Sequence, residues 1–172
     1  PKKFTNVIID NSSFTYMTDK QFLLDNKVNN REAGYEVLTP VLVNTDILLV
    51  NRGWVTSNSR QTLPDLSIKK SSNNIEGYIY YYSDPYELET AKYSSKFPIV
   101  IQNLIIEDIS SILNYNVLPY VLILSKPQDN SYVIQSNYKA NPEYKHYMYA
   151  GQWFLFAIIG LIFMVILMRK EK

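Results

Sequence analysis

The chain has 172 residues, of which 47% are hydrophobic, and this size supports one folded domain rather than two. Its formal net charge is +1 and its lysines are scattered, so no basic stripe indicates a nucleic-acid partner. The absence of cysteine excludes a thiolate nucleophile, a CxxC redox pair, and zinc or copper sites built from cysteine.

Residues 1–140 are predicted to form a mainly β domain, either a small barrel or a sandwich. Short apolar runs alternate there with Asn, Ser, Asp and Pro at the spacing of about 8 to 12 residues that is typical of such folds. The expected strands are 21–28, 37–43, 47–55, 75–82, 99–104, 117–124 and 131–135. One short helix is predicted over residues 107–114, because acidic residues at its start suit the positive end of the helix dipole.

A hairpin is predicted where the strands 37–43 and 47–55 flank the short loop 44–46. Pro40 has no N–H to donate to a neighbouring strand. Its strand is therefore expected to lie at a sheet edge or to start a paired stretch. Gly53 provides the backbone freedom that a bulge or turn requires.

Residues 150–168 contain no charged side chain, and only Gln152 is strongly polar. At ~1.5 Å per residue they span roughly 28 Å, which matches the hydrocarbon core of a bilayer. A buried helix of a soluble protein would keep a polar face, and this segment has none beyond Gln152. We therefore predict a transmembrane helix over residues 141–169, followed by a short basic cytoplasmic tail, 170–172.

The start of this helix is predicted from Asn141, which suits the N-cap, and Pro142, which suits the first helical position. The only histidine of the chain, His146, then lies about one turn above the apolar core. Aromatic residues gather at the same depth, as they do at membrane interfaces. These are Tyr144, Tyr147, Tyr149 and Trp153.

At about 100° per residue the helix has two different faces. One stripe comprises His146, Tyr149, Ala150, Trp153, Ala157 and Gly160, and the opposite stripe comprises Leu155, Ile159, Ile162 and Ile166. Small residues allow another helix or a planar cofactor to approach closely, whereas bulky aliphatic residues suit lipid. We therefore expect the histidine stripe to face a partner.

Two interpretations of His146 remain open at this point. It is either an amphipathic residue of the aromatic belt or an axial ligand of a haem iron. In the second case a neutral imidazole nitrogen binds the iron, while Tyr149 and Trp153 flank the macrocycle. A lone histidine does not suffice for a typical metal site built from histidines alone.

Four sequence motifs occur in order along the chain. They are FLLDN at 22–26, GYEVLTP at 34–40, LVNRGWV at 49–55, and HxxYAxQWF from His146 to Phe154. Together they resemble the surfeit locus protein one family, called Shy in yeast. The last motif is similar to the signature at the start of that family's second membrane helix.

The resemblance implies an assembly factor for cytochrome c oxidase rather than an enzyme. In bacterial members this role is linked to haem a binding and delivery to oxidase subunit one, and the histidine that matches His146 is the proposed ligand. The implied cofactor is haem a. The implied partners are oxidase subunit one, membrane lipid and, further, haem a synthase. The implied location is the bacterial plasma membrane with an extracytoplasmic domain, or alternatively the mitochondrial inner membrane.

Family members usually carry a first membrane helix, which does not occur in this sequence. The sequence opens at Pro1 without an initiator methionine, and we interpret it as a fragment or a processed form. A two-helix arrangement that could sandwich a haem therefore depends on residues upstream of Pro1.

The family's central motif is matched by Asn51, Arg52, Gly53 and Trp54. We favour structural roles for these residues over a binding site. Trp54 is expected to point inward along its strand, and Gly53 to relieve crowding. Arg52 is expected to pair with a carboxylate.

Two functions remain open from the sequence. One is a chaperone that binds haem a. The other is a membrane-anchored structural interaction module that stabilises oxidase subunits during assembly without binding a cofactor, using Ala157 and Gly160 to approach a partner helix. Catalysis is not expected, because carboxylate pairs such as Asp84 with Glu87 occur on any soluble surface.

Overall fold

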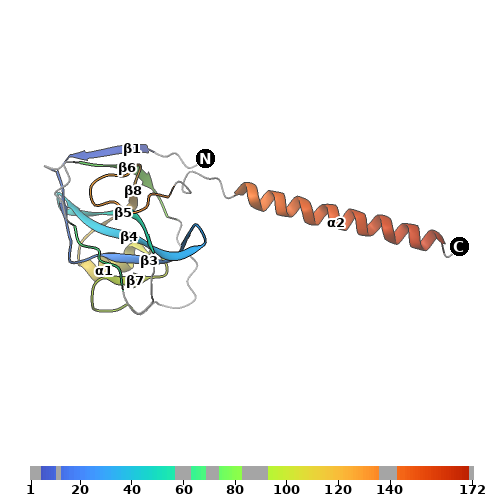
Figure 1. The fold of residues 1–172 in the computed structure, drawn as a ribbon, viewed down its shortest axis with the longest axis horizontal. Helices are drawn as coiled ribbons and strands as arrows, with labels where there is room; N and C mark the ends of the chain where they lie inside the picture. The colour runs from blue at the N-terminus through green and yellow to red at the C-terminus, as the bar shows by residue number, and fades with distance from the viewer. Residues whose placement is uncertain are drawn as a thin grey trace. The chain divides into compact units, whose positions relative to one another are not determined.

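The computed structural model describes residues 5–10, 13–56, 63–68, 74–82, 93–135 and 143–170. The chain divides into two compact units, residues 1–135 and 136–172, which are described separately (Figure 1). The first unit contains every described strand and one short helix, and the second contains a single long helix.

Eight strands form one open sheet in the first unit, with the order β1-β6-β8-β5-β4-β3-β7 and with β2 alongside β4. Their bounds are β1 Thr5–Asp10, β2 Thr15–Tyr16, β3 Phe22–Asn29, β4 Glu32–Val43, β5 Asp46–Thr56, β6 Asn74–Tyr80, β7 Ile99–Ile101 and β8 Val117–Leu124. Figure 1 shows β1 and β7 at opposite ends of this arrangement. The prediction of a mainly β domain is confirmed.

The central strands β4 and β5 are buried on both faces. Each carries an unbroken run of buried residues, and successive side chains of a strand point to opposite faces. On one face Leu48 and Val50 join a cluster with residues of β4, β6 and β8, and Val37 joins a second cluster with Leu23 and Tyr35. Both clusters lie on the same face. Thr39 pairs with Val50 and Val37 pairs with Leu23, and Val37 and Thr39 are two residues apart on β4, so their side chains point to one side.

The predicted elements agree with the structure to different degrees. Strand 117–124 has its predicted bounds, and the short helix is α1, Ile106–Leu113, which packs on β8 and buries Ile109 and Leu113. The strand predicted at 131–135 is wrong, because it forms only one isolated bridge, between Trp54 and Val133. β1 and β2 were not predicted.

The β4–β5 hairpin has a tighter loop than expected. Val43 pairs with Asp46, so only Asn44 and Thr45 connect the strands, and Asn44 takes the left-handed φ of 56° that short hairpin loops require. The edge position expected for Pro40 is wrong, because β4 lies between β5 and β3.

The proline is tolerated because of its place along β4. β3 pairs with β4 as far as Leu38, and β2 pairs with it from Val41 onward. Pro40 lies between these two stretches, and its carbonyl accepts a hydrogen bond from the Met17 N–H at 2.9 Å. Because a strand residue directs its N–H and C=O to the same side, the missing donor falls in the gap between two partner strands.

The second unit is α2, Glu143–Lys170, a helix of 28 residues. Its stretch Tyr147–Lys170 contains an 18-residue window with a mean hydropathy of 2.4, and the helix is long and apolar enough to cross a membrane. No residue of this window is buried, whereas a core helix has a covered face. The predicted N-cap residues Asn141 and Pro142 lie outside the described residues.

Candidate functional site

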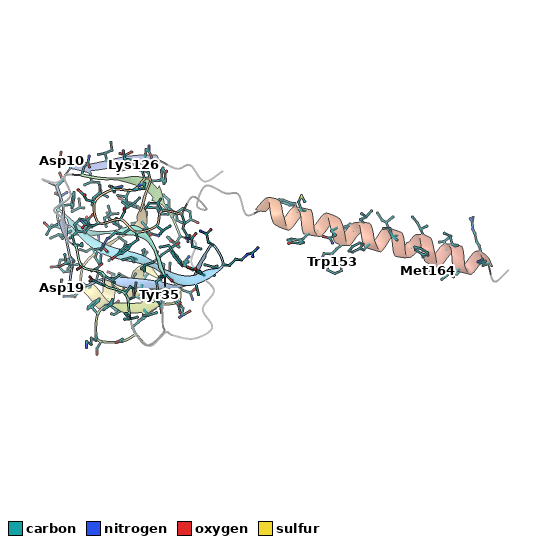
Figure 2. The ribbon with its side chains drawn as sticks, in the orientation of Figure 1. Asp10, Asp19, Tyr35, Lys126, Trp153 and Met164 are labelled. Carbon is teal, nitrogen blue, oxygen red and sulfur yellow. The ribbon has the colours of Figure 1, made fainter. Side chains whose placement is uncertain are left out.

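The histidine stripe begins in the first turn of α2. His146 lies in this turn, although its side chain is outside the described part of the structure. Tyr149 and Trp153 follow three and seven residues later, about one and two helical turns along the same stripe. Their side chains are 64% and 71% exposed, and Figure 2 shows Trp153 projecting from the helix.

The remaining surface of α2 is apolar and exposed. Leu155, Ile159, Ile162 and Ile166 on the opposite stripe are between 42% and 55% exposed. On the histidine stripe, a Cβ added to Gly160 would meet nothing within 4 Å. The helix therefore offers a bulky aliphatic face and a face with room for a partner surface.

In the β domain, the residues that match the family's central motif are buried in the core. Arg52 on β5 is only 1% exposed, although it carries a charge at neutral pH. Its NH1 donates to Gln21 Oε1 at 2.9 Å and to Thr39 Oγ1 at 3.3 Å, and its Nε donates to the Asn130 carbonyl at 2.8 Å. NH1 also lies 3.3 Å from the carbonyl of Leu66.

The expectation that Arg52 pairs with a carboxylate is therefore wrong within the described residues. The acceptors of its hydrogen bonds there are an amide, a hydroxyl and carbonyls. Its charge also lies over the ring of Tyr132, with 4.9 Å from the guanidinium carbon to the ring centroid. Burial lowers the pKa of the Arg52 guanidinium, and the neighbouring Tyr132 opposes this shift. The same burial raises the pKa of the Tyr132 phenol, and the Arg52 charge opposes that shift.

A β-bulge at Gly53 separates Arg52 from Trp54. Glu36 pairs with Trp54 and Leu38 with Asn51, so Arg52 and Gly53 together oppose one residue of β4. Gly53 has a φ of 109°, and its N–H donates to Asn51 Oδ1 at 2.9 Å. A Cβ on this glycine would lie 2.8 Å from the Val133 carbonyl oxygen, which confirms that it relieves crowding.

The bulge reverses the alternation of side chains along β5, so that Arg52 and Trp54 point to opposite faces of the sheet. Trp54 is 5% exposed, as predicted, and its Nε1 donates to the Lys27 carbonyl at 3.1 Å. A Cβ on Gly34 would lie 2.6 Å from the indole ring of Trp54. Both motif glycines therefore serve the packing of β5.

A second buried polar group lies on the Trp54 face of the sheet. The Glu36 carboxylate is 3% exposed and accepts a hydrogen bond from Asn51 Nδ2 at 3.1 Å. Lys27 Nζ lies 3.7 Å from it, and the Tyr82 hydroxyl lies 3.4 Å from it. This carboxylate thus has one cation and two hydrogen-bond donors beside it.

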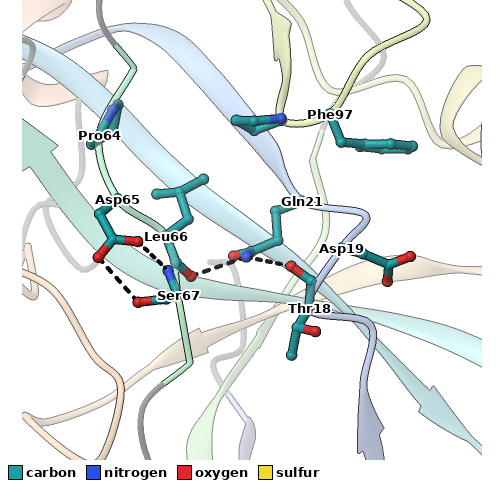
Figure 3. Close-up of a pocket in the computed structure, with 9 residues that line it drawn as sticks. Thr18, Asp19, Gln21, Pro64, Asp65, Leu66, Ser67 and Phe97 are labelled. Atoms are coloured by element: carbon teal, nitrogen blue, oxygen red, sulfur yellow. Dashed lines mark hydrogen bonds between the residues drawn. The ribbon is translucent and has the colours of Figure 1, made fainter.

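An open pocket of about 300 Å³ lies beside the Arg52 network (Figure 3). The Gln21 amide forms part of its wall and donates from Nε2 to the carbonyls of Thr18 and Leu66, as the dashed lines show. Among the described residues, the pocket lining also includes Asp19 and Asp65 but no basic residue. Two carboxylates disfavour an anionic ligand at this position.

The structure brings some predicted site residues together and leaves others apart. His146, Tyr149 and Trp153 share one helix stripe, whereas Arg52 and Trp54 are buried in the other unit. Sequence reasoning missed Gln21, Thr39 and Tyr132 as partners of Arg52. No local pattern identifies them, since they lie 31, 13 and 80 positions away in the sequence.

Within the described residues, no group of three or more His, Cys, Asp or Glu side chains could hold a metal ion.

A β domain joined in sequence to a helix apolar enough to cross a bilayer defines a class, the membrane-anchored β-domain proteins. Within this class, a model of the SURF1 family matches residues 12–158, and the chain belongs to that family. This match confirms the resemblance inferred from the sequence motifs. SURF1 proteins are cytochrome c oxidase assembly factors, and membership of the family implies a role in that assembly. No match was found among characterised proteins or among solved structures.

Proposed function

We propose that this protein binds haem a through His146 and delivers it to subunit one of cytochrome c oxidase. The observation that carries the proposal is the stripe at the start of α2, where one histidine and two exposed aromatic residues lie at intervals of three and four residues. Membership of the SURF1 family supports the oxidase as the target. Haem a synthase is the proposed source of the cofactor.

The residues of the stripe fit a haem better than those of the β domain. A haem iron requires an axial ligand, and a neutral imidazole nitrogen is a common one. Tyr149 and Trp153 offer exposed rings beside that ligand. By contrast, the pocket beside Gln21 is lined by two aspartates. The guanidinium of Arg52 already donates hydrogen bonds to neutral groups of the β domain.

Each residue has a distinct role in this proposal. His146 would hold the haem by an imidazole nitrogen at the membrane interface. Tyr149 and Trp153 would supply apolar rings beside it and limit the access of water. When bound, haem a supplies the redox-active iron centre that the oxidase subunit acquires.

The proposed location is the bacterial plasma membrane, with the β domain on the extracytoplasmic side and the mitochondrial inner membrane as the alternative. Arg169 and Lys170 in the last turn of α2 support a cytoplasmic C-terminus, because basic residues favour that side. The opposite end of α2 would then lie at the extracytoplasmic interface, with His146 close to the aqueous surface of the bilayer.

The test uses the full chain, expressed in cells that make haem a, and measures the Soret absorbance per protein after purification in detergent. His146→Gly should lose most of the bound haem, and added imidazole should restore it by filling the space of the missing ring. Tyr147→Ala is the matched control, since Tyr147 is adjacent in the helix but lies about 100° from the stripe. Equal haem content in wild type and His146→Gly would reject ligation by His146.

A structural interaction module without cofactor is the second candidate, and the open surface at Gly160 favours it. In that case the double variant Ala157→Leu, Gly160→Leu should lose co-purification with the oxidase while His146→Gly retains it. The opposite pattern would support the haem-binding function.

A further inference from the structure

The strand β1 is an outer strand of the sheet, with β6 as its neighbour on one side. It pairs antiparallel with β6 along its whole length, from Thr5 opposite Ile79 to Asp10 opposite Asn74, without a register shift. Within the part of the chain that the structure describes, no strand pairs with its other side. An edge of this kind presents a row of N–H and C=O groups that can pair with another strand.

The strand β1 lacks several of the devices that protect sheet edges. Its sequence, TNVIID, contains no proline, glycine or lysine, and its pairing with β6 contains no bulge. The strand at the other end of the sheet, β7, has only three residues, and such a short edge offers little to pair with. The two ends of the sheet therefore differ in their capacity for edge pairing.

The side chains of β1 alternate between the core and the surface. Val7 and Ile9 pack against the core cluster, which places Asn6, Ile8 and Asp10 on the other face. Ile8 is 66% exposed, so a β-branched apolar side chain occupies the centre of an otherwise polar strand face. A neighbouring strand that presents an apolar residue at this position would remove Ile8 from water.

We propose that β1 pairs antiparallel with β1 of a second copy of this chain, about a two-fold axis at Ile8. Residues opposite each other in such a pair share one face of the sheet. Ile8 then lies opposite the partner's Ile8, Val7 opposite the partner's Ile9, and Asn6 opposite the partner's Asp10. Apolar side chains meet apolar ones on both faces, and an amide meets a carboxylate at each end.

The side chains of the strand distinguish this register from the nearest alternative. An axis at Val7 would place Ile8 opposite the partner's Asn6 and Ile9 opposite the partner's Thr5, so that apolar and polar side chains would be mismatched. The axis at Ile8 avoids both mismatches and places no like charges opposite one another. Because the contact is the same on both copies, it closes as a dimer rather than growing into a filament.

The first experiment cross-links single-cysteine variants of the full chain in native membranes. Because the wild type has no cysteine, the introduced residue is the sole thiol of the chain. Ile8→Cys treated with a short bis-maleimide should give mostly the homodimer on a denaturing gel, since opposite Cβ atoms lie ~4.5–5.5 Å apart. Val28→Cys is the matched control, because Val28 is 59% exposed on the β3–β4 hairpin, away from β1. Equal cross-linking of the two variants would overturn the proposal, and so would an Ile8→Cys adduct with a different protein only.

The second experiment tests the register by charge. Asn6→Asp in the Ile8→Cys background places a carboxylate opposite the partner's Asp10, and should lower the yield of dimer roughly five-fold. Adding Asp10→Asn restores a pair of one carboxylate and one amide, and the yield should recover. Circular dichroism checks that each variant is folded. Failure of the second substitution to restore the yield in folded protein would overturn the proposed pairing.

Discussion

The core around Arg52 and the surface of α2 differ in how far their side chains are exposed to solvent. In the β domain a charged side chain is 1% exposed and is bonded by groups from distant segments, whereas in α2 aromatic side chains such as Trp153 remain 71% exposed. The difference indicates that motif residues of the first region are used to build the fold. In the second region the described aromatic and aliphatic side chains remain exposed.

Arg52→Met should have the largest effect on this contrast. Methionine fills similar space but leaves the acceptors on Gln21, Leu66 and Asn130 without this donor, and we expect a loss of about 3 kcal/mol in the free energy of unfolding. Urea unfolding of the full chain in detergent, followed by the fluorescence of Trp54 in a Trp153→Phe background, measures it. Arg52→Lys should lose less, because an ammonium keeps the charge and three donors. A loss below 1 kcal/mol for Arg52→Met would contradict the structural role.

Glycine substitutions compare the two regions directly. Gly34→Ala should cost about 2 kcal/mol, because its Cβ would lie 2.6 Å from the indole ring of Trp54 and the core must shift. Gly160→Ala adds the same methyl group where nothing lies within 4 Å, and should change the unfolding free energy of the β domain by less than about 0.5 kcal/mol. The same urea titration applies. Equal effects would show that the packing around Gly34 is not specific.

Tyr132→Phe should cost about 1 kcal/mol at neutral pH, because the phenol donates a hydrogen bond to the Asp65 carbonyl at 3.0 Å. The folded-state pKa of Tyr132 is raised above its ordinary value near 10. Its contribution is therefore fully present below pH 10 and is lost as the pH rises through the folded pKa. Urea titrations at pH 8 and pH 11 should show the difference between wild type and variant shrinking, and a difference that grows would refute the assignment.

The smallest effect is expected from Lys126→Met, which removes the ion pair with Glu76. The Lys126 side chain is 61% exposed, so water and salt screen the pair, and the loss should be about 0.5 kcal/mol or less. Repeating the titration in 0.5 M NaCl should remove most of that difference. A larger loss that salt does not change would place this pair among the core interactions.

Sequence patterns predicted some elements well and missed others for identifiable reasons. Strand 117–124 combines β-branched and aliphatic residues with turn signals on both sides, and its bounds were predicted correctly. The strand β1 has only six residues, and its partner β6 lies about 70 positions further along the chain, so its pairing leaves no local signal. The region 131–135 has strand-like composition, but only its bridge to Trp54 forms.

The candidate site divides in the same way. Helical spacing alone assigns His146, Tyr149 and Trp153 to one stripe, because a helix is a local structure with a fixed period. The identity of the partners of Arg52 could not be predicted, because they are contributed by the residue before β3, by β4 and by two segments that meet β5 only in the folded domain. The expectation of a carboxylate partner failed for this reason.

By itself the sequence determined the mainly β domain, the apolar helix and the histidine stripe, since these depend on composition and on the periods of strand and helix. Tertiary structure alone decided that β4 is an inner strand, that the bulge at Gly53 sends Arg52 and Trp54 to opposite faces, and that a buried guanidinium is bonded by neutral groups. These features depend on contacts between residues far apart in the chain. The free energy of such contacts is set by packing and desolvation, which local patterns do not encode.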